Sequence, residues 1–277
     1  MGDFYGKLNA RWQSSGSLLC VGLDPVLESM PPQFVSARTP FADFCREIVD
    51  ATAGFACAFK FQAACFGQHG AEDELERAIH HVLSCHPGVP VILDSKRGDI
   101  GSTAKRYACE AFTRYGADAV TVNPYLGTDS IEAFTDHADR GVILLCRTSN
   151  PGSADLQELD CGGMKVYERV AHLAAEKWNR GNNVALVVGA TYPEVLGRVR
   201  GIVGDMPLLV PGVGAQGGDL GAVLENGLTE AGHGLMINVS RHIVQAGERE
   251  RGDPAKAAHD AAELYYNEIN RLRSKWS

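Results

Sequence analysis

The chain has 277 residues, of which 45% are hydrophobic and 22% charged, and these values are ordinary for a globular protein. They exclude a disordered chain, a collagen-like fibre and a mucin-like stalk. The 26 Lys and Arg residues against 34 Asp and Glu residues give a formal net charge of −8, which argues against nucleic acid as the main partner. If the ligand is an anion, we therefore expect a few cationic side chains at the site to neutralise its charge.

Apolar runs rich in β-branched residues alternate with runs of helical period along the whole chain. In chain order the predicted strands are 18–24, 55–61, 89–96, 117–123, 142–148, 184–189, 208–212 and 234–239. Each is followed by a predicted helix, at 41–52, 72–84, 103–115, 130–138, 164–179, 193–202, 220–226 and 254–273.

These eight strand–helix units predict a single α/β domain over residues 1–277. The strands are continuously apolar, which indicates burial on both faces, as in a parallel sheet. No linker or low-complexity stretch divides the chain. We expect a (β/α)8 TIM barrel, with a doubly wound parallel sheet as the alternative that the same alternation could build.

The cysteines and the termini bear on location. Eight cysteines occur without any C-x-x-C spacing, so we expect free thiols, mostly buried, in a reducing compartment. Residues 1–13 lack the apolar stretch of a signal peptide, and no apolar run is long enough to span a membrane. A cytoplasmic location is the default expectation.

Polar side chains end several of the predicted strands. Catalytic groups of a barrel enzyme gather at the carboxyl ends of its strands, so these residues predict a ring around one site. The residues are Asp24, Lys60, Gln62, Asp94, Lys96, Asn123, Thr148, Ser149 and Arg241.

The densest motif is Val-Ile-Leu-Asp-Ser-Lys-Arg-Gly-Asp-Ile at 91–100. Asp94 and Lys96 are two apart on a strand, so both side chains are expected on one face, in the barrel mouth. A carboxylate and an ammonium buried together both stay ionised, which gives a fixed field for catalysis. A structural ion pair remains the alternative. Asp99 follows in the loop before the next helix.

A second motif, Pro211 to Gly218, places glycines in a G-x-G-x-x-G pattern after a strand. A dinucleotide site is rejected, because the motif lies too near the C-terminus and no acidic residue ends the next strand. A glycine loop after strand seven, with Arg241 after strand eight, instead predicts a phosphate site at about 211–220. A merely flexible loop is the alternative.

The histidines give a weaker signal. His80 and His81 lie in a helical run that ends at Cys85 and His86, and we interpret them as helix-surface residues rather than a metal site. His242 follows the last strand near the predicted mouth, without a role that the sequence assigns.

With these motifs the chain resembles the orotidine 5′-phosphate decarboxylase family, and within it the longer bacterial subgroup. The resemblance covers about residues 17–244, with extra length near 26–39 and 152–163. It rests on Val-Gly-Leu-Asp-Pro at 21–25, Phe59-Lys60, the D-x-K-x-x-D-I-x-x-T run at 94–103, Thr-Ser-Asn-Pro-Gly at 148–152, and segments 211–219 and 238–241.

This resemblance implies conversion of orotidine 5′-monophosphate to UMP and CO2, the last step of de novo pyrimidine biosynthesis, without metal or organic cofactor. Lys96 would be the general acid that protonates C6, and Asp94 would face the substrate carboxylate. The implied charge network comprises Lys60, Asp94, Lys96 and Asp99.

The resemblance also implies the residues that bind the nucleotide. Asp24, Lys60 and Thr103 would contact ribose hydroxyls, and Ser149 would bind the pyrimidine amide. Pro211, Gln216 and Arg241 would belong to the phosphate end of the site. In a homodimer, Asp99 and Thr103 would reach the site of the partner subunit.

Two other functions stay open. A metal-dependent sugar-phosphate decarboxylase or aldolase of the same superfamily shares D-x-K-x-x-D, but holds Mg²⁺ with a carboxylate at the end of strand two, where this chain has Lys60. A barrel that binds a phosphate ligand without turning it over is the second alternative.

Overall fold

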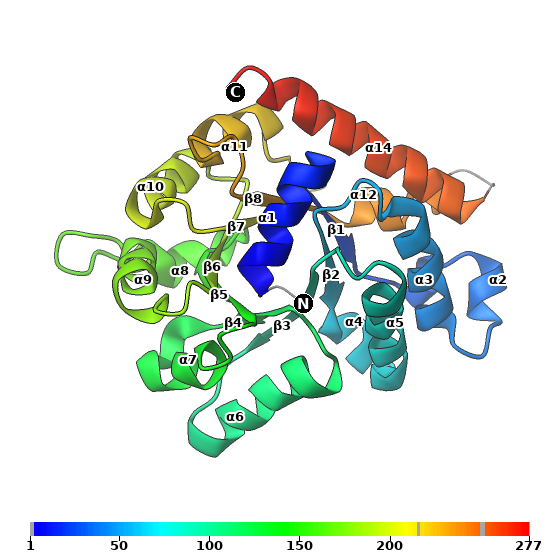
Figure 1. Ribbon diagram of the computed structural model, residues 1–277, viewed down its shortest axis with the longest axis horizontal. Coiled ribbons are helices and arrows are strands. Elements are labelled where there is room, and N and C mark those ends of the chain that lie inside the picture. Colours follow the sequence, from blue (N-terminus) through cyan, green and yellow to red (C-terminus); the bar gives the residue numbers. More distant parts are fainter. Residues whose placement is uncertain (1–2, 215–216, 250–252, 277) are drawn as a thin grey trace.

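The computed structural model describes residues 3–214, 217–249 and 253–276, and it forms a closed parallel barrel. The strands follow one another around the barrel in chain order, and the last pairs with the first (Figure 1). This closure confirms the predicted TIM barrel and excludes the doubly wound sheet. The strands are β1 Leu19–Leu23, β2 Ala58–Gln62, β3 Val91–Arg97, β4 Ala119–Val122, β5 Gly141–Arg147, β6 Val184–Val188, β7 Leu208–Pro211 and β8 Leu235–Val239.

Helices surround the barrel (Figure 1), and none in the described part of the chain is long and apolar enough to cross a membrane. The α-helices are α1 Phe4–Ser15, α2 Pro32–Val35, α3 Pro40–Thr52, α4 Ala63–Gly67, α5 Glu72–Cys85, α6 Gly101–Cys109, α7 Thr128–Thr135, α8 Ala154–Gln157, α9 Val166–Leu173, α10 Pro193–Val203, α11 Leu220–Gly227, α12 Arg241–Val244, α13 Ala246–Arg249 and α14 Pro254–Arg273. Short 3-10 turns are η1 Leu27–Ser29, η3 Pro124–Leu126 and η4 Pro151–Ser153.

Two predicted helices end differently from the sequence expectation. The segments 103–115 and 164–179 each begin as an α-helix, α6 and α9, and finish in a π-helical turn, η2 Glu110–Arg114 and η5 Ala174–Trp178. A π-turn changes the period by one residue, which hydrophobic periodicity over a short window does not detect.

Helix α1 closes the end of the barrel where the strands begin. The sequence analysis predicted no helix at these residues. Helix α1 lies across the centre of the ring in Figure 1. Lys7 Nζ lies 2.6 Å from Asp118 Oδ1, just before β4, and the Trp12 indole N–H donates to the Leu235 carbonyl at 3.1 Å. The sequence does carry the signal, because Asp3 caps the first turn and Gly16 ends the helix in a left-handed conformation.

The cysteine prediction is confirmed only in part. All eight cysteines are free thiols, but Cys85, Cys109 and Cys161 are exposed and Cys65 is half-buried. Cys20, Cys45, Cys57 and Cys146 are buried, and burial raises the pKa of the Cys20 thiol to about 12.

Replacing Trp12 should destabilise the barrel. Trp12 is 3% exposed, so Trp12→Ala removes a large buried side chain and should lower the free energy of unfolding by about 3–5 kcal/mol. Urea unfolding followed by circular dichroism measures the change. Trp276→Ala is the matched control, because Trp276 is 48% exposed, and it should leave the unfolding midpoint nearly unchanged. Equal effects of the two substitutions would show that α1 does not hold the barrel closed.

Candidate active site

A cavity of about 510 Å³ opens at the carboxyl ends of the strands, the end opposite α1. Most of the site residues predicted from the sequence line it, and they come from strands spread around the barrel. These residues are Asp24, Lys60, Asp94, Lys96, Ser149, Pro211 and Arg241, together with Gln62.

Four of them form a continuous chain of alternating charge. Lys60 Nζ, at the end of β2, lies 2.9 Å from Asp94 Oδ2 and 3.3 Å from Asp24 Oδ1. Lys96 Nζ lies 2.7 Å from the other oxygen of Asp94, Oδ1. Lys60 and Asp94 are buried, whereas the Lys96 side chain is half-exposed and lines the cavity.

Burial and charge act in opposite directions on the pKa values of this network. Burial opposes ionisation of Asp94, but the ammonium groups of Lys60 and Lys96 outweigh it and hold the carboxyl pKa well below its usual range. Burial likewise opposes the charge of Lys60, and the carboxylates of Asp24 and Asp94 outweigh it, which raises the Lys60 pKa. Lys60 and Asp94 are therefore both ionised at neutral pH.

A backbone irregularity in β3 aims Lys96 at Asp94. The pairing register between β3 and β4 shifts between Leu93 and Arg97, and Lys96 adopts a left-handed φ of 47°. Such a conformation is uncommon outside glycine and recurs at functional sites. The predicted shared face of Asp94 and Lys96 is thus confirmed, although a bulge rather than a regular strand produces it.

Thr121, which the sequence analysis missed, holds this arrangement from the neighbouring strand. Its hydroxyl donates to Asp94 Oδ1 at 2.8 Å and accepts from the Lys96 backbone N–H at 2.9 Å. Gln62 Nε2 donates to the other Asp94 oxygen at 3.2 Å. A threonine inside an apolar strand resembles an ordinary β-former, so the sequence offers no signal for this role.

Asp99 and Thr103 do not join the network within this chain. The Asp99 carboxylate accepts the Ile100 backbone N–H at 2.8 Å, and the Asp99 carbonyl accepts the Ser130 hydroxyl. Thr103 is exposed on α6, and neither residue lines the cavity.

Arg147 is a second residue that the sequence analysis missed. It is 2% exposed at the end of β5, and its Nε donates to Glu158 Oε1 at 3.0 Å. Its guanidinium also lies 4.0 Å from the centre of the Tyr192 ring. Through Glu158, Arg147 anchors the segment that follows Ser149, several residues of which line the cavity. Its only sequence signal is a cation inside an otherwise apolar strand.

Ser149 itself is positioned by a glycine. A Cβ atom at Gly189, after β6, would lie 2.8 Å from the Ser149 Cα, closer than such atoms approach. Gly189 N–H also donates to the Arg147 carbonyl at 2.8 Å. The adjacent Thr148 hydroxyl is engaged within the loop, where it donates to Asn150 Oδ1 at 2.7 Å.

The predicted phosphate end of the cavity carries the glycine loop and Arg241. Gly212, Gly214 and Gly217 have φ values of 105°, 83° and 75°, which explains the requirement for glycine. Gln216 lies outside the described residues. Arg241 begins α12 and lines the cavity, with no ion pair to any residue in the described ranges. His242 does not line the cavity; its Nδ1 shares a 2.6 Å hydrogen bond with the Tyr265 hydroxyl.

Comparison with known proteins identifies the family of this chain. The model of the "Orotidine 5'-phosphate decarboxylase / HUMPS family" matches residues 17–259. The chain belongs to this family. It is 56% identical to the orotidine 5′-phosphate decarboxylases of Azoarcus sp. (strain BH72) and Dechloromonas aromatica (strain RCB), in each case over 98% of this chain and 99% of the relative. A solved OMP decarboxylase of Leishmania donovani superposes with a TM-score of 0.84 at 40% identity, covering 98% of both chains.

Removing Lys60 should raise the pKa of Asp94. In Lys60→Met the buried carboxylate loses its ion pair at 2.9 Å, so the burial that opposes ionisation is less fully offset. Carbon-13 NMR titration of the aspartate carboxyls measures the shift. Lys7→Met, which breaks the Asp118 pair at the opposite end of the barrel, is the control and should leave Asp94 unchanged.

The lowered pKa of Asp94 also predicts how the free energy of unfolding changes at acid pH. An aspartate titrates near 3.9 in an unfolded chain, and Asp94 titrates lower in the folded protein. Its contribution to the free energy of unfolding is therefore complete above the unfolded pKa and is lost as the pH falls toward the folded pKa. An Asp94 pKa that is the same with and without Lys60 would refute this electrostatic account.

Proposed function

We propose that this protein is a carboxy-lyase that converts orotidine 5′-monophosphate to UMP and CO2, the last step of de novo pyrimidine biosynthesis. The observation that carries the proposal is the row of ion pairs Asp24–Lys60–Asp94–Lys96 at the mouth of the barrel, in a member of this family. Relatives named orotidine 5′-phosphate decarboxylase match nearly the full chain.

Lys96 is assigned the role of general acid. When the bond between C6 and the substrate carboxylate breaks, CO2 leaves and the bonding electron pair stays on C6. A fixed cation nearby stabilises that charge, and an ammonium can also supply the proton that completes UMP. Lys96 suits this role because its side chain reaches the cavity, whereas Lys60 is buried between two carboxylates.

Asp94 is assigned a place beside the substrate carboxylate. It is held by two ammonium groups and the Thr121 hydroxyl, so it stays ionised and orients Lys96. A second carboxylate bound next to it would be repelled in the substrate, and that repulsion would be relieved when CO2 departs.

The reaction is proposed to need neither a metal nor an organic cofactor. The two cavity carboxylates, Asp24 and Asp94, are both paired with the Lys60 ammonium, which would repel a divalent cation from this place. The metal-dependent relatives considered above carry a carboxylate at the position of Lys60.

The nucleotide is proposed to lie across the cavity between the network and the glycine loop. Asp24 and Lys60 would contact the ribose, and Ser149, steadied by Gly189, would bind the pyrimidine amide. Arg241 would hold the phosphate with Gln216, beside Pro211 and the glycine turns. Arg241 suits an anion, because no carboxylate among the described residues pairs with it.

The active form is proposed to be a homodimer that shares its sites. Asp99 and Thr103 stand away from this chain's own cavity, with Ile100 exposed between them. Tyr125 and Leu126 are also exposed, on the turn η3. The helix that follows this turn, α7, contacts Asp99, because the Ser130 hydroxyl donates to the Asp99 carbonyl. Contact with a second copy would bury these apolar side chains and carry Asp99 and Thr103 into its site.

The chain is further proposed to act as one domain in the cytoplasm. The two ends of the chain meet on the barrel, because the Tyr266 hydroxyl on α14 donates to the Ser15 carbonyl at the end of α1, at 2.9 Å. Eight free thiols suit a reducing compartment.

Lys96→Ala should abolish turnover while leaving nucleotide binding in place. A continuous ultraviolet assay with excess EDTA should show loss of orotidine 5′-monophosphate with the wild type, and a rate lower by about a thousandfold or more with the variant. UMP affinity, measured by calorimetry, should survive. Lys177→Ala, an exposed lysine on the outer surface, is the control and should turn over normally.

Other outcomes of this assay would contradict specific parts of the proposal. Near-normal turnover of Lys96→Ala would refute the role of Lys96. Wild-type protein that binds UMP without turnover would instead be a silent binder. Turnover of a keto-sugar phosphate that requires Mg²⁺ would indicate the metal-dependent relative.

Mixing two inactive variants should restore activity if the site is shared. In a mixed dimer of Lys96→Ala and Asp99→Ala chains, one site combines the intact Lys96 with the intact Asp99 of the other chain. After subunit exchange at equal amounts, about a quarter of the wild-type activity should return, as two-fold symmetry requires. A mixture that stays inactive although light scattering shows dimers would place Asp99 outside the partner's site.

A further inference from the structure

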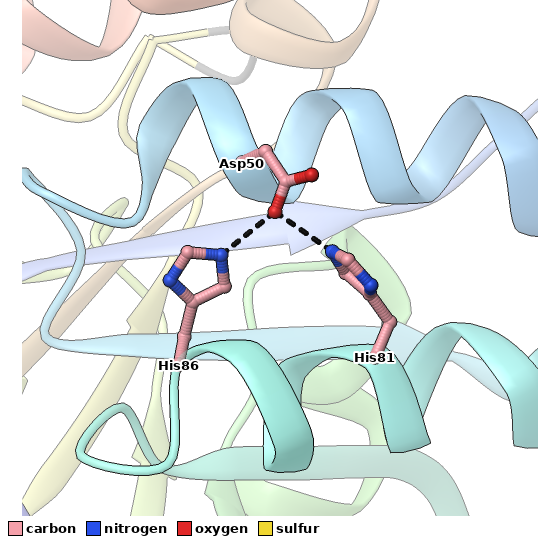
Figure 2. A group of neighbouring side chains, drawn as sticks. All are labelled: Asp50, His81 and His86. Atoms are coloured by element: carbon pink, nitrogen blue, oxygen red, sulfur yellow. Dashed lines mark hydrogen bonds and ion pairs between the residues drawn. The ribbon is translucent and has the colours of Figure 1, made fainter.

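A second group of polar side chains lies on the outside of the barrel, where α3 and α5 pack side by side. His81 Nε2 and His86 Nε2 each lie 2.7 Å from the same carboxylate oxygen, Asp50 Oδ1. Figure 2 shows both imidazole rings rising from α5 and its C-terminal end toward Asp50 on α3. The three ligand atoms all lie within 4.8 Å of one another.

This cluster is separate from the proposed active site. None of its residues lines the catalytic cavity. His86 precedes the start of β3, whereas Asp94 and Lys96 lie near the other end of that strand. The cluster therefore sits toward the closed end of the barrel, and the proposed reaction has no use for it.

We propose that Asp50, His81 and His86 form a binding site for a divalent late transition metal ion, with Zn²⁺ as the best match. Two imidazole nitrogens and one carboxylate oxygen are the ligand set of many zinc sites, which leave a fourth position to water. Imidazole disfavours Mg²⁺ and Ca²⁺, which prefer oxygen ligands.

Metal binding needs an adjustment of the observed geometry. Ligands bound at about 2.0–2.1 Å in a tetrahedron lie about 3.3 Å apart. Asp50 Oδ1, at 2.7 Å from each nitrogen, must therefore move away from both by about 0.6 Å, and the two nitrogens, now within 4.8 Å of each other, must settle at about 3.3 Å. The Asp50 side chain is half-exposed and can rotate, whereas the two rings are mostly buried.

A nearby thiol supports the orientation of one ring. Cys85 Sγ lies 3.7 Å from His81 Nδ1, the nitrogen that faces away from Asp50. This contact occupies Nδ1 and leaves Nε2 directed at the metal position. Metal-binding histidines commonly use their second nitrogen in this way.

Metal bound here would join α3 to α5, the helices on either side of β2 in the sequence. An ion that binds the folded chain stabilises it by mass action. At a hundredfold excess over the dissociation constant, the thermal unfolding midpoint should rise by roughly 5 °C. The closed-end position predicts that decarboxylation does not depend on the metal.

Calorimetric titration of ZnCl2 into EDTA-treated full-length protein tests the site. We expect one Zn²⁺ per chain at micromolar concentration, and no binding of Mg²⁺. His81→Gln should bind Zn²⁺ at least about tenfold more weakly and lose the thermal shift, because one of three ligands is gone. His80→Gln is the matched control, since His80 is exposed on the same helix outside the cluster, and it should bind as the wild type does. Asp50→Asn removes the charge of the ligand on α3 and should weaken Zn²⁺ binding in the same way.

Cobalt spectroscopy distinguishes this site from zinc capture by exposed thiols. Co²⁺ held by the cluster should give visible absorption bands but no thiolate charge-transfer band. The substitution His81→Gln should remove these visible bands. Absence of Zn²⁺ binding to the wild type would overturn the proposal. So would equal Zn²⁺ binding by the wild type, His81→Gln and Asp50→Asn, or a thiolate band from Cys85.

Discussion

The candidate site depends on the buried ion pair between Lys60 and Asp94. Neither charge could remain in the barrel mouth alone, because burial of an unpaired ion is costly. Together, and with Asp24 and Lys96 at the two ends, they form a row of alternating charges at hydrogen-bonding distance. The row places one ammonium, that of Lys96, at the cavity with its neighbours already fixed. Such preorganisation is a main way in which an enzyme stabilises charge that develops on a reacting atom.

The barrel supplies this arrangement by bringing strand ends together. Asp24, Lys60 and Asp94 come from the first three strands, which are neighbours in the closed sheet. The bulge in β3 and the Thr121 hydroxyl from β4 then turn Lys96 onto Asp94. At the far side of the cavity, Arg147 and Gly189 fix the backbone around Ser149. The charged row and the segment around Ser149, which line the same cavity, are thus held by different strands.

The sequence predicted those parts of the molecule that follow from period and residue type. Apolar strands that alternate with amphipathic helices predicted the barrel, and most of the polar residues predicted at strand ends line the cavity. The parts that it missed depend on tertiary contacts. Thr121 and Arg147 sit in strands whose other residues are apolar, and only the fold shows what their side chains touch. Asp50 precedes both histidines of the Asp50–His81–His86 cluster by more than thirty positions and lies on another helix. The spacing of the histidines along their own helix therefore indicated only surface residues. Asp99 and Thr103 were named from resemblance, and their proposed role requires a second chain.

A crystal structure of the Lys96→Ala variant with orotidine 5′-monophosphate bound would show whether the substrate carboxylate lies beside the charged row. Loss of the proton donor should trap the unreacted substrate. We expect the pyrimidine carboxylate to face Asp94 and the position vacated by Lys96, with the phosphate beside Arg241 and the glycine loop. A nucleotide that binds with its phosphate at Asp24 and Lys60, or outside this cavity, would contradict the account.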